Sequence, residues 1–129
     1  MSILVDTHVF LWAATRDSAL SESVQQILNS TESIFFSAAS AWEIAIKWSK
    51  GALDLPYQPN VFIPEALNHA GYRQLAVNVQ AASSVSSLPF HHRDPFDRIL
   101  IAQAIANKMR LLSIDVVFKK YEVDVFWPD

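Results

Sequence analysis

The chain has no cysteine among its 129 residues and only two glycines, Gly51 and Gly71. Without cysteine it can form no disulfide, no thiolate zinc site and no cysteine nucleophile, which fits a reducing cytoplasm. The two glycines are far apart, so the glycine-rich loops that bind phosphates or dinucleotides are absent. These absences exclude thiol chemistry and most classes of nucleotide-binding protein.

Long hydrophobic runs are also missing. No apolar run approaches the ~20 residues of a membrane-spanning helix. The first six residues contain no basic residue and reach Asp6 after three apolar ones, so we expect no signal peptide. With 51% hydrophobic residues, the chain is expected to form one globular, cytoplasmic domain over residues 1–129.

The net charge of −3 lacks the basic excess typical of proteins that bind nucleic acids. Four of the 13 acids are candidates for a site, as argued below, and the remaining nine face ten Lys and Arg. A divalent ion would neutralise much of the acidic site. The charge argues against tight nonspecific binding to DNA and leaves open a small RNA target or a basic protein partner.

Apolar segments alternate with helical patterns along the chain. Short apolar segments predict strands over residues 3–5, 33–37, 75–77, 111–114 and 123–127. Helical spacing predicts helices over residues 21–29, 38–50 (followed by Gly51), 64–69 (ended by Gly71), 79–88 and 94–108, with a proline-containing loop over 55–60. This alternation predicts an α/β fold with a mostly parallel sheet.

Four acids occupy equivalent places in this pattern. Asp6 and Asp115 each follow a predicted strand, and Glu43 and Asp97 are placed in the first turns of predicted helices. In a parallel sheet the strand ends and the following helix starts share one edge, where ligands bind. We therefore expect all four carboxylates at the same edge of the molecule.

Each acid also has a purely structural interpretation. Ser40 and Glu43 match a capping box, Asp94 and Pro95 with Asp97 make a good helix start, Asp115 fits a cap for residues 116–119, and Asp6 fits a turn. Four like charges at one edge, however, raise each other's cost of ionisation. Their coincidence favours a site for a hard cation such as Mg²⁺ or Mn²⁺, which would support phosphodiester hydrolysis.

Four segments now resemble one known family: LVDTH at residues 4–8, SAASAWEIAIK at 37–47, HRDPFDR at 92–98 and LLSID at 111–115. They resemble the PIN domain, and more closely the VapC-type toxins of bacterial toxin–antitoxin pairs. The resemblance implies a three-layer αβα fold, Mg²⁺- or Mn²⁺-dependent endoribonuclease activity on RNA, inhibition by a cognate antitoxin, and a homodimer. It implies one such nuclease domain over the whole chain.

The resemblance places the family's acidic residues on Asp6, Glu43, Asp97 and Asp115. Asp6 and Asp97 are implied as direct metal ligands. Glu43 is implied as a ligand or as an aid in deprotonating the attacking water. Asp115 is implied as a ligand acting directly or through water.

Thr7 and Ser113 are implied as donors that orient the metal-binding oxygens. One position departs from the family, because Ile114 stands where an Arg or another polar residue is common. The departure would alter contact with substrate while leaving the metal site intact.

Basic residues near these segments are candidates for binding the RNA backbone. They are Lys47, Lys50, Arg93 and Arg98, of which Arg98 is favoured because it adjoins Asp97. The alternative for each is an ordinary solvated charge on a helix face.

The histidines and Asp94 are assigned mainly structural roles. His91 and His92 either touch phosphate, pair with a neighbouring acid or are ordinary surface and packing residues. His8 is expected to be structural, since the neighbouring carboxylates favour a hard ion. Asp94 is expected to cap a helix rather than bind metal.

Two competing functions remain open. An aspartate-based phosphatase of the haloacid dehalogenase kind usually has a second Asp two residues after the first, where this chain has His8. A PIN-like protein that binds RNA or an antitoxin without cleaving RNA is the other alternative. Binding of Mn²⁺ is expected of the nuclease and is not required of a pure binding protein.

Overall fold

The computed structural model describes residues 2–30 and 33–128 and contains a five-stranded sheet in the order β3-β2-β1-β4-β5. All four strand pairs are parallel. The strands are β1 Ser2–Val5, β2 Ser33–Ser37, β3 Arg73–Leu75, β4 Arg110–Leu112 and β5 Val125–Phe126. The predicted α/β class with a parallel sheet is confirmed, and the predicted domain's end residues 1 and 129 lie outside the described residues.

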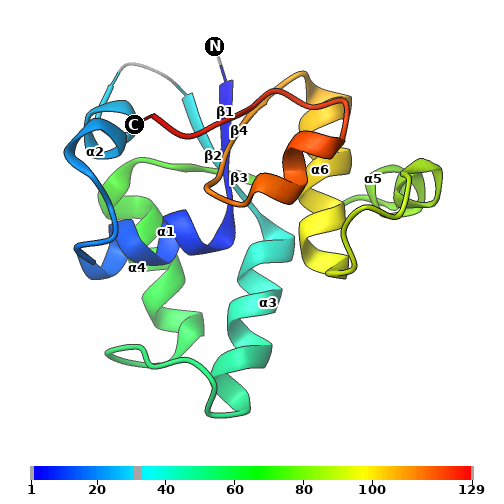
Figure 1. Ribbon diagram of the computed structural model, residues 1–129. Coiled ribbons are helices and arrows are strands. Elements are labelled where there is room, and N and C mark those ends of the chain that lie inside the picture. The colour runs from blue at the N-terminus through cyan, green and yellow to red at the C-terminus, as the bar shows by residue number, and fades with distance from the viewer. Residues whose placement is uncertain (1, 31–32, 129) are drawn as a thin grey trace.

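Helices connect the strands and cover the sheet (Figure 1). The α-helices are α1 Thr7–Thr15, α2 Glu22–Leu28, α3 Ala38–Ser49, α4 Pro59–Ala70, α5 Val79–Ser84 and α6 Pro95–Asn107, and the 3₁₀ helices are η1 Val85–Ser87 and η2 Val116–Lys120. Within the described part of the chain, no helix has the length and apolar character needed to cross a bilayer.

Alternating strand residues pack on opposite faces of the sheet. Ile3 and Val5 join a cluster with side chains from α1, α2, α3 and α4. Leu4, between them in sequence, joins a second cluster with residues of α6 and η2. Because successive side chains of a strand point to opposite faces, β1 is covered on both sides and the fold has three layers.

The strand order places a topological switch at β1. The chain moves from β1 through β2 to β3 on one side, and β4 and β5 then lie on the other side of β1. At such a point the connections after neighbouring strands diverge and leave a crevice beyond their carboxyl ends. Asp6 follows β1 directly and Asp115 lies just beyond β4, so two predicted site residues lie beyond the carboxyl ends of these neighbouring strands.

Several predicted boundaries were wrong. Residues 7–15 form α1, for which no helix was predicted. Helix α4 begins at Pro59, inside the predicted loop, and contains Pro64 in its interior. β3 lies at Arg73–Leu75, so it begins two residues earlier than the predicted strand over 75–77. β4 and β5 are shorter than predicted.

The two glycines end helices, as predicted. Gly71 is the C-cap of α4 with φ +76°, and its N–H donates to the Leu67 carbonyl at 2.9 Å. Gly51 follows α3 with φ +73°, and its N–H donates to the Trp48 carbonyl at 3.0 Å. Both adopt the left-handed conformation that glycine accepts without steric cost.

Candidate active site

Asp6 is a buried carboxylate at the start of α1. Its side chain is held from two sides: Oδ1 accepts from the N–H of Val9 at 3.0 Å, and Oδ2 accepts from the Ser113 hydroxyl at 2.5 Å. Burial raises the pKa of Asp6 above its usual value, while the hydrogen bonds from Ser113 and Val9 act in the opposite direction. Asp6, for which a turn was predicted, therefore caps α1 and is buried at the end of β1.

Ser113 links Asp6 to Asp115. While its hydroxyl donates to Asp6, it accepts from the N–H of Asp115 at 3.0 Å. Asp115 caps η2, since its Oδ1 accepts from the N–H of Val117 at 3.0 Å. The cap predicted for Asp115 is confirmed, and the Ser113 hydroxyl contacts Asp6, one of the four predicted acids.

Glu43 is buried in α3, although it lies in the second turn of that helix. The N-cap of α3 is Ser37, so the predicted capping box of Ser40 with Glu43 is wrong and the predicted first-turn position of Glu43 is wrong as well. Ser40 is instead fully buried, and its hydroxyl lies 2.8 Å from that of Thr7. This polar contact joins α3 to the start of α1.

Thr7 and Lys47 hold the two oxygens of Glu43. The Thr7 hydroxyl donates to Oε1 at 2.8 Å, and Lys47 Nζ lies 2.7 Å from Oε2. The hydrogen bond to Glu43 raises the pKa of Lys47. Thr7 is 4% exposed and Glu43 2% exposed, so this pair is as buried as Asp6.

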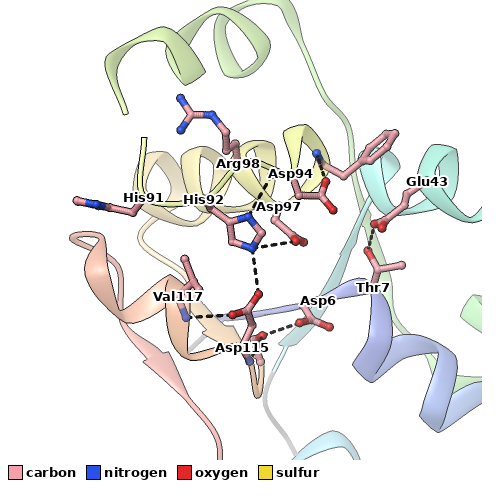
Figure 2. A network of polar contacts seen from close by, with 12 residues as sticks. Asp6, Thr7, Glu43, His91, His92, Asp94, Asp97, Arg98, Asp115 and Val117 are labelled. Carbon is pink, nitrogen blue, oxygen red and sulfur yellow. Dashed lines mark hydrogen bonds and ion pairs between the residues drawn. The ribbon is translucent and has the colours of Figure 1, made fainter. Parts of the chain in front are cut away.

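Asp97 lies in the first turn of α6, as predicted, and Asp94 caps that helix by accepting from the N–H of Phe96 at 2.9 Å. Burial raises the pKa of Asp97 to about 8, with further contributions from the charges of Asp94, Asp6, Glu43 and Asp115. All four predicted acids therefore interact at one place, and Figure 2 shows the carboxylates of Asp6, Asp97 and Asp115 turned toward one another.

His92 lies between two of these carboxylates. Its Nε2 is 3.0 Å from Asp115 Oδ2 and 3.2 Å from Asp97 Oδ2. Of the alternatives weighed for His92, the structure shows pairing with neighbouring acids. His92, Asp97 and Asp115 form a group of side chains whose candidate ligand atoms all lie within 4.8 Å of one another.

Arg98 does not occupy a position suited to holding RNA. It is 4% exposed, and its guanidinium donates to the carbonyls of Pro89 at 2.9 Å and Val85 at 3.1 Å. The RNA-binding role predicted for Arg98 is therefore not supported, because its donors are used to fix the segment before α6. Arg93 and Lys50 are exposed, and Lys47 is partly exposed.

The donor set fits a hard divalent cation. Carboxylate oxygens dominate it, and a single imidazole lies beside them. Oxygen ligands of this kind suit Mg²⁺ and Mn²⁺. Burial first and the charges of neighbouring acids second raise the pKa of Asp97, and a bound divalent ion would favour its ionised form.

Three polar residues of this network were missed from the sequence or given no definite role: Ser40, His92 and Tyr121. Tyr121 is buried, and its hydroxyl accepts from the N–H groups of His91 and His92 at 3.0 and 2.7 Å. A sequence signal did exist for His92. It lies two residues before the helix cap Asp94, in the segment that leads into the first turn of α6, where Asp97 is found.

Comparison with known proteins yields related sequences and folds. Ribonuclease VapC22 of Mycobacterium tuberculosis (strain ATCC 25618 / H37Rv) is 24% identical over 115 residues, which cover 88% of this chain and 87% of that protein. VapBC2 from Rickettsia felis, in a crystal structure with a promoter DNA fragment, superposes with a TM-score of 0.76 at 15% identity over the whole of both chains. DNA-bound VapBC from Salmonella typhimurium gives a TM-score of 0.69 at 12% identity over 98% of this chain and 97% of that one.

These structural likenesses show a shared fold, and the three-layer α/β architecture predicted from the sequence is confirmed. A family model described as the PIN domain matches residues 3–124, from the first residue after Ser2 to the end of the loop before β5. That span includes every one of the four acids and both hydroxyl residues that contact them. The chain therefore belongs to the PIN domain family.

Proposed function

We propose that this protein is a Mg²⁺- or Mn²⁺-dependent endoribonuclease and the toxin of a toxin–antitoxin pair. The observation that carries the proposal is the meeting of Asp6, Glu43, Asp97 and Asp115 at the switch point of the sheet, with the pKa of Asp97 raised to about 8. The similarity of this chain to Ribonuclease VapC22 in sequence and to VapBC2 in fold supports the proposed ribonuclease activity.

In this proposal Asp6 and Asp97 bind the metal, and Asp115 binds it directly or through water. The bound ion supplies a Lewis acid that activates water and neutralises charge on the phosphodiester. The protein's own contribution is to fix the carboxylates. Ser113 fixes one oxygen of Asp6, and Asp115 is fixed through its cap on η2.

Glu43 either binds the ion or accepts the proton of the attacking water. Its carboxylate is fixed in both cases, because Thr7 contacts Oε1 and Lys47 contacts Oε2. The two contacts come from different elements, α1 and α3, so the position of Glu43 depends on how these helices pack. In this proposal Thr7 and Ser113 orient the carboxylate oxygens that they contact.

The RNA backbone is proposed to lie along the exposed cations near these acids. Arg93 is exposed one residue after His92, and Lys47 is within the site but partly exposed. Ile114 is 53% exposed and places an apolar side chain beside Asp115. We propose that Arg93 and Lys47 contact phosphate groups while Ile114 contacts a sugar or base.

The proposed partners besides RNA are a cognate antitoxin and a second copy of this chain. The resemblance to VapC-type toxins implies these partners, and the structures that share the fold include two named VapBC, each with bound DNA. Inhibition would be measured as loss of RNA cleavage when the neighbouring antitoxin protein is added, and dimerisation by analytical ultracentrifugation.

The deciding experiment measures cleavage of a structured RNA pool by the purified protein with Mg²⁺, with Mn²⁺ and with EDTA. Asp97→Asn is compared with Asp54→Asn, a substitution of the same chemical kind in an exposed loop residue. Cleavage is expected to need the metal, to vanish in Asp97→Asn and to persist in Asp54→Asn. Binding of Mn²⁺ by a folded wild-type protein that cleaves no RNA would favour the binding-only alternative.

A further inference from the structure

We propose that His92 is a positioning residue that holds Asp97 and Asp115 in place for the metal, acting as a hydrogen-bond donor and not as a ligand. This inference rests on the proposed function, since it concerns the same site. It assigns a definite role to a histidine for which the sequence left several open.

The contacts of the ring determine which nitrogen carries the proton. Nδ1 lies 3.2 Å from the N–H of Asp94, which can only donate, so Nδ1 acts as the acceptor. In a neutral imidazole the other nitrogen then carries the proton. Nε2–H therefore donates to Asp115 Oδ2 at 3.0 Å, and the same nitrogen lies 3.2 Å from Asp97 Oδ2.

A single N–H thus joins carboxylates from two elements. Asp97 belongs to α6, whereas Asp115 caps η2, and Figure 2 shows the imidazole placed between them. By contacting both carboxyl groups, His92 sets the distance between them. Asp97 Oδ1 has no hydrogen-bond partner within residues 2–30 and 33–128, which leaves this oxygen free for a cation.

The backbone of His92 is itself firmly held. The buried Tyr121 hydroxyl accepts from its N–H at 2.7 Å, and Arg98 fixes the preceding segment through the carbonyl of Pro89. The imidazole also packs at 5.4 Å from the fully buried ring of Phe118. Side chains whose own position is fixed in this way are suited to orienting ligands.

The neighbouring His91 provides a natural comparison. Its N–H donates to the same Tyr121 hydroxyl at 3.0 Å, and its ring packs against the Tyr121 ring at 5.1 Å. The His91 side chain is exposed and points away from the carboxylates in Figure 2. Two adjacent histidines therefore share backbone support, but only His92 contacts the site.

The test is the affinity of the metal-free protein for Mn²⁺, measured by the electron paramagnetic resonance signal of free Mn²⁺. His92→Gln places an amide donor near the position of Nε2, whereas His92→Asn reaches only the position of Nδ1. We expect His92→Asn to weaken Mn²⁺ binding about 10- to 100-fold. His92→Gln is expected to retain most of the affinity, and His91→Ala, the matched control, all of it.

Two spectroscopic readouts separate positioning from direct ligation. Long-range ¹H–¹⁵N correlation of the metal-free protein is expected to show the Nε2–H form of His92; the Nδ1–H form would overturn the inference. With ¹⁵N-histidine and bound Mn²⁺, electron spin echo spectra are expected to lack a directly coordinated imidazole nitrogen. Equal Mn²⁺ affinities of wild type and His92→Asn would also overturn it.

The outcomes distinguish this inference from the proposed function. Tight Mn²⁺ binding that depends on His92, without any RNA cleavage, would contradict the nuclease and leave the role of His92 standing. If the wild type needs Mn²⁺ to cleave RNA and His92→Asn binds Mn²⁺ equally well, only the role of His92 is contradicted. A folded wild-type protein that binds no Mn²⁺ would contradict both.

Discussion

At the scale of single residues, the site is organised around two buried carboxylates, Asp6 and Glu43, and two partly exposed ones, Asp97 and Asp115. Asp97 has the largest consequence, because burial and four nearby acids raise its pKa to about 8. In the unfolded chain the pKa of an aspartate is near ~3.9. Between these two values the folded protein holds a proton that the unfolded chain releases, so this residue couples stability to pH.

The metal-free protein should lose stability as the pH rises from 5 to 7. In this window the folded state binds more protons than the unfolded state, and the free energy of unfolding falls by up to about 1.4 kcal/mol per pH unit for one such group. The stabilisation is complete below the unfolded pKa and is lost as the pH rises through about 8. Urea denaturation in EDTA at pH 5, 6 and 7 measures the effect.

Asp97→Asn isolates the contribution of Asp97 to the pH dependence of the free energy of unfolding. The amide cannot ionise, so the fall between pH 5 and 7 should shrink by roughly 2 kcal/mol in this variant. The mutant should also be more stable than the wild type at pH 7 in EDTA. An identical pH dependence in both proteins would show that Asp97 is ionised in the folded state throughout this range.

At the scale of elements, Arg98 shows how a charge next to the site can serve the fold. It projects from α6 to the segment around η1, where its guanidinium donates to the carbonyls of Val85 and Pro89 and stacks on Phe90 at 4.1 Å. A buried charged donor with several carbonyl partners satisfies backbone groups that the segment itself leaves unpaired. Arg98 thus ties the segment before α6 to that helix.

Arg98→Lys should therefore destabilise the protein by about 1–3 kcal/mol, because an ammonium cannot reproduce the planar set of donors. Hydrogen exchange is expected to accelerate over residues 85–92, which the guanidinium fixes. Arg93→Lys is the control, since Arg93 is exposed. Unchanged stability together with weaker RNA binding would instead restore the RNA-contact role predicted from the sequence.

The C-cap of α4 allows a second prediction for an element. Gly71 has φ +76°, and a Cβ added there meets nothing within 4 Å, so the cost of substitution is conformational and not steric crowding. Gly71→Ala should lower the free energy of unfolding by about 1 kcal/mol. Gly71→Asn should cost less, because asparagine tolerates this conformation. Equal losses in thermal denaturation would contradict the explanation.

The sequence predicted the buried strands and the capped helices best, because those carry local signals. Asp94 with Pro95 marks the start of α6, and the apolar run before Asp6 marks β1. Helix α1 was missed because its sequence, THVFLWAAT, is apolar or aromatic over most positions and lacks a clear polar face. Helix α4 was started too late because Pro64 was taken as its beginning, whereas Pro59 occupies the first turn.

The acids of the site were predictable from their places after strands and at helix starts, and their partners were not. Ser40 looked like a helix cap, but Ser37 takes that place and Ser40 contacts Thr7, 33 residues away. Arg98 looked available for RNA because its burial depends on a distant segment. Contacts between remote segments are set by packing, which local sequence patterns do not record.

At the scale of the whole molecule, metal binding should stabilise the fold. The four acids come from separate elements, so an ion that bridges them binds the folded state and not the unfolded one. Mn²⁺ at 100 times its dissociation constant should add about 2.7 kcal/mol to the free energy of unfolding. Thermal denaturation with Mn²⁺ and with EDTA measures this gain, which should be absent in Asp97→Asn; a similar gain in that variant would place the ion elsewhere.

The hydrogen bond from Ser113 to Asp6 spans 107 positions of the chain. Translation delivers Asp6 long before Asp115, and β1 gains its neighbour β4 only once residues 110–112 have left the ribosome. A nascent chain that has not reached Asp115 cannot bring the four carboxylates together, even if its earlier helices have formed. If the protein cleaves RNA as proposed, the ribosome that makes it holds an inert polypeptide until Asp115 has emerged.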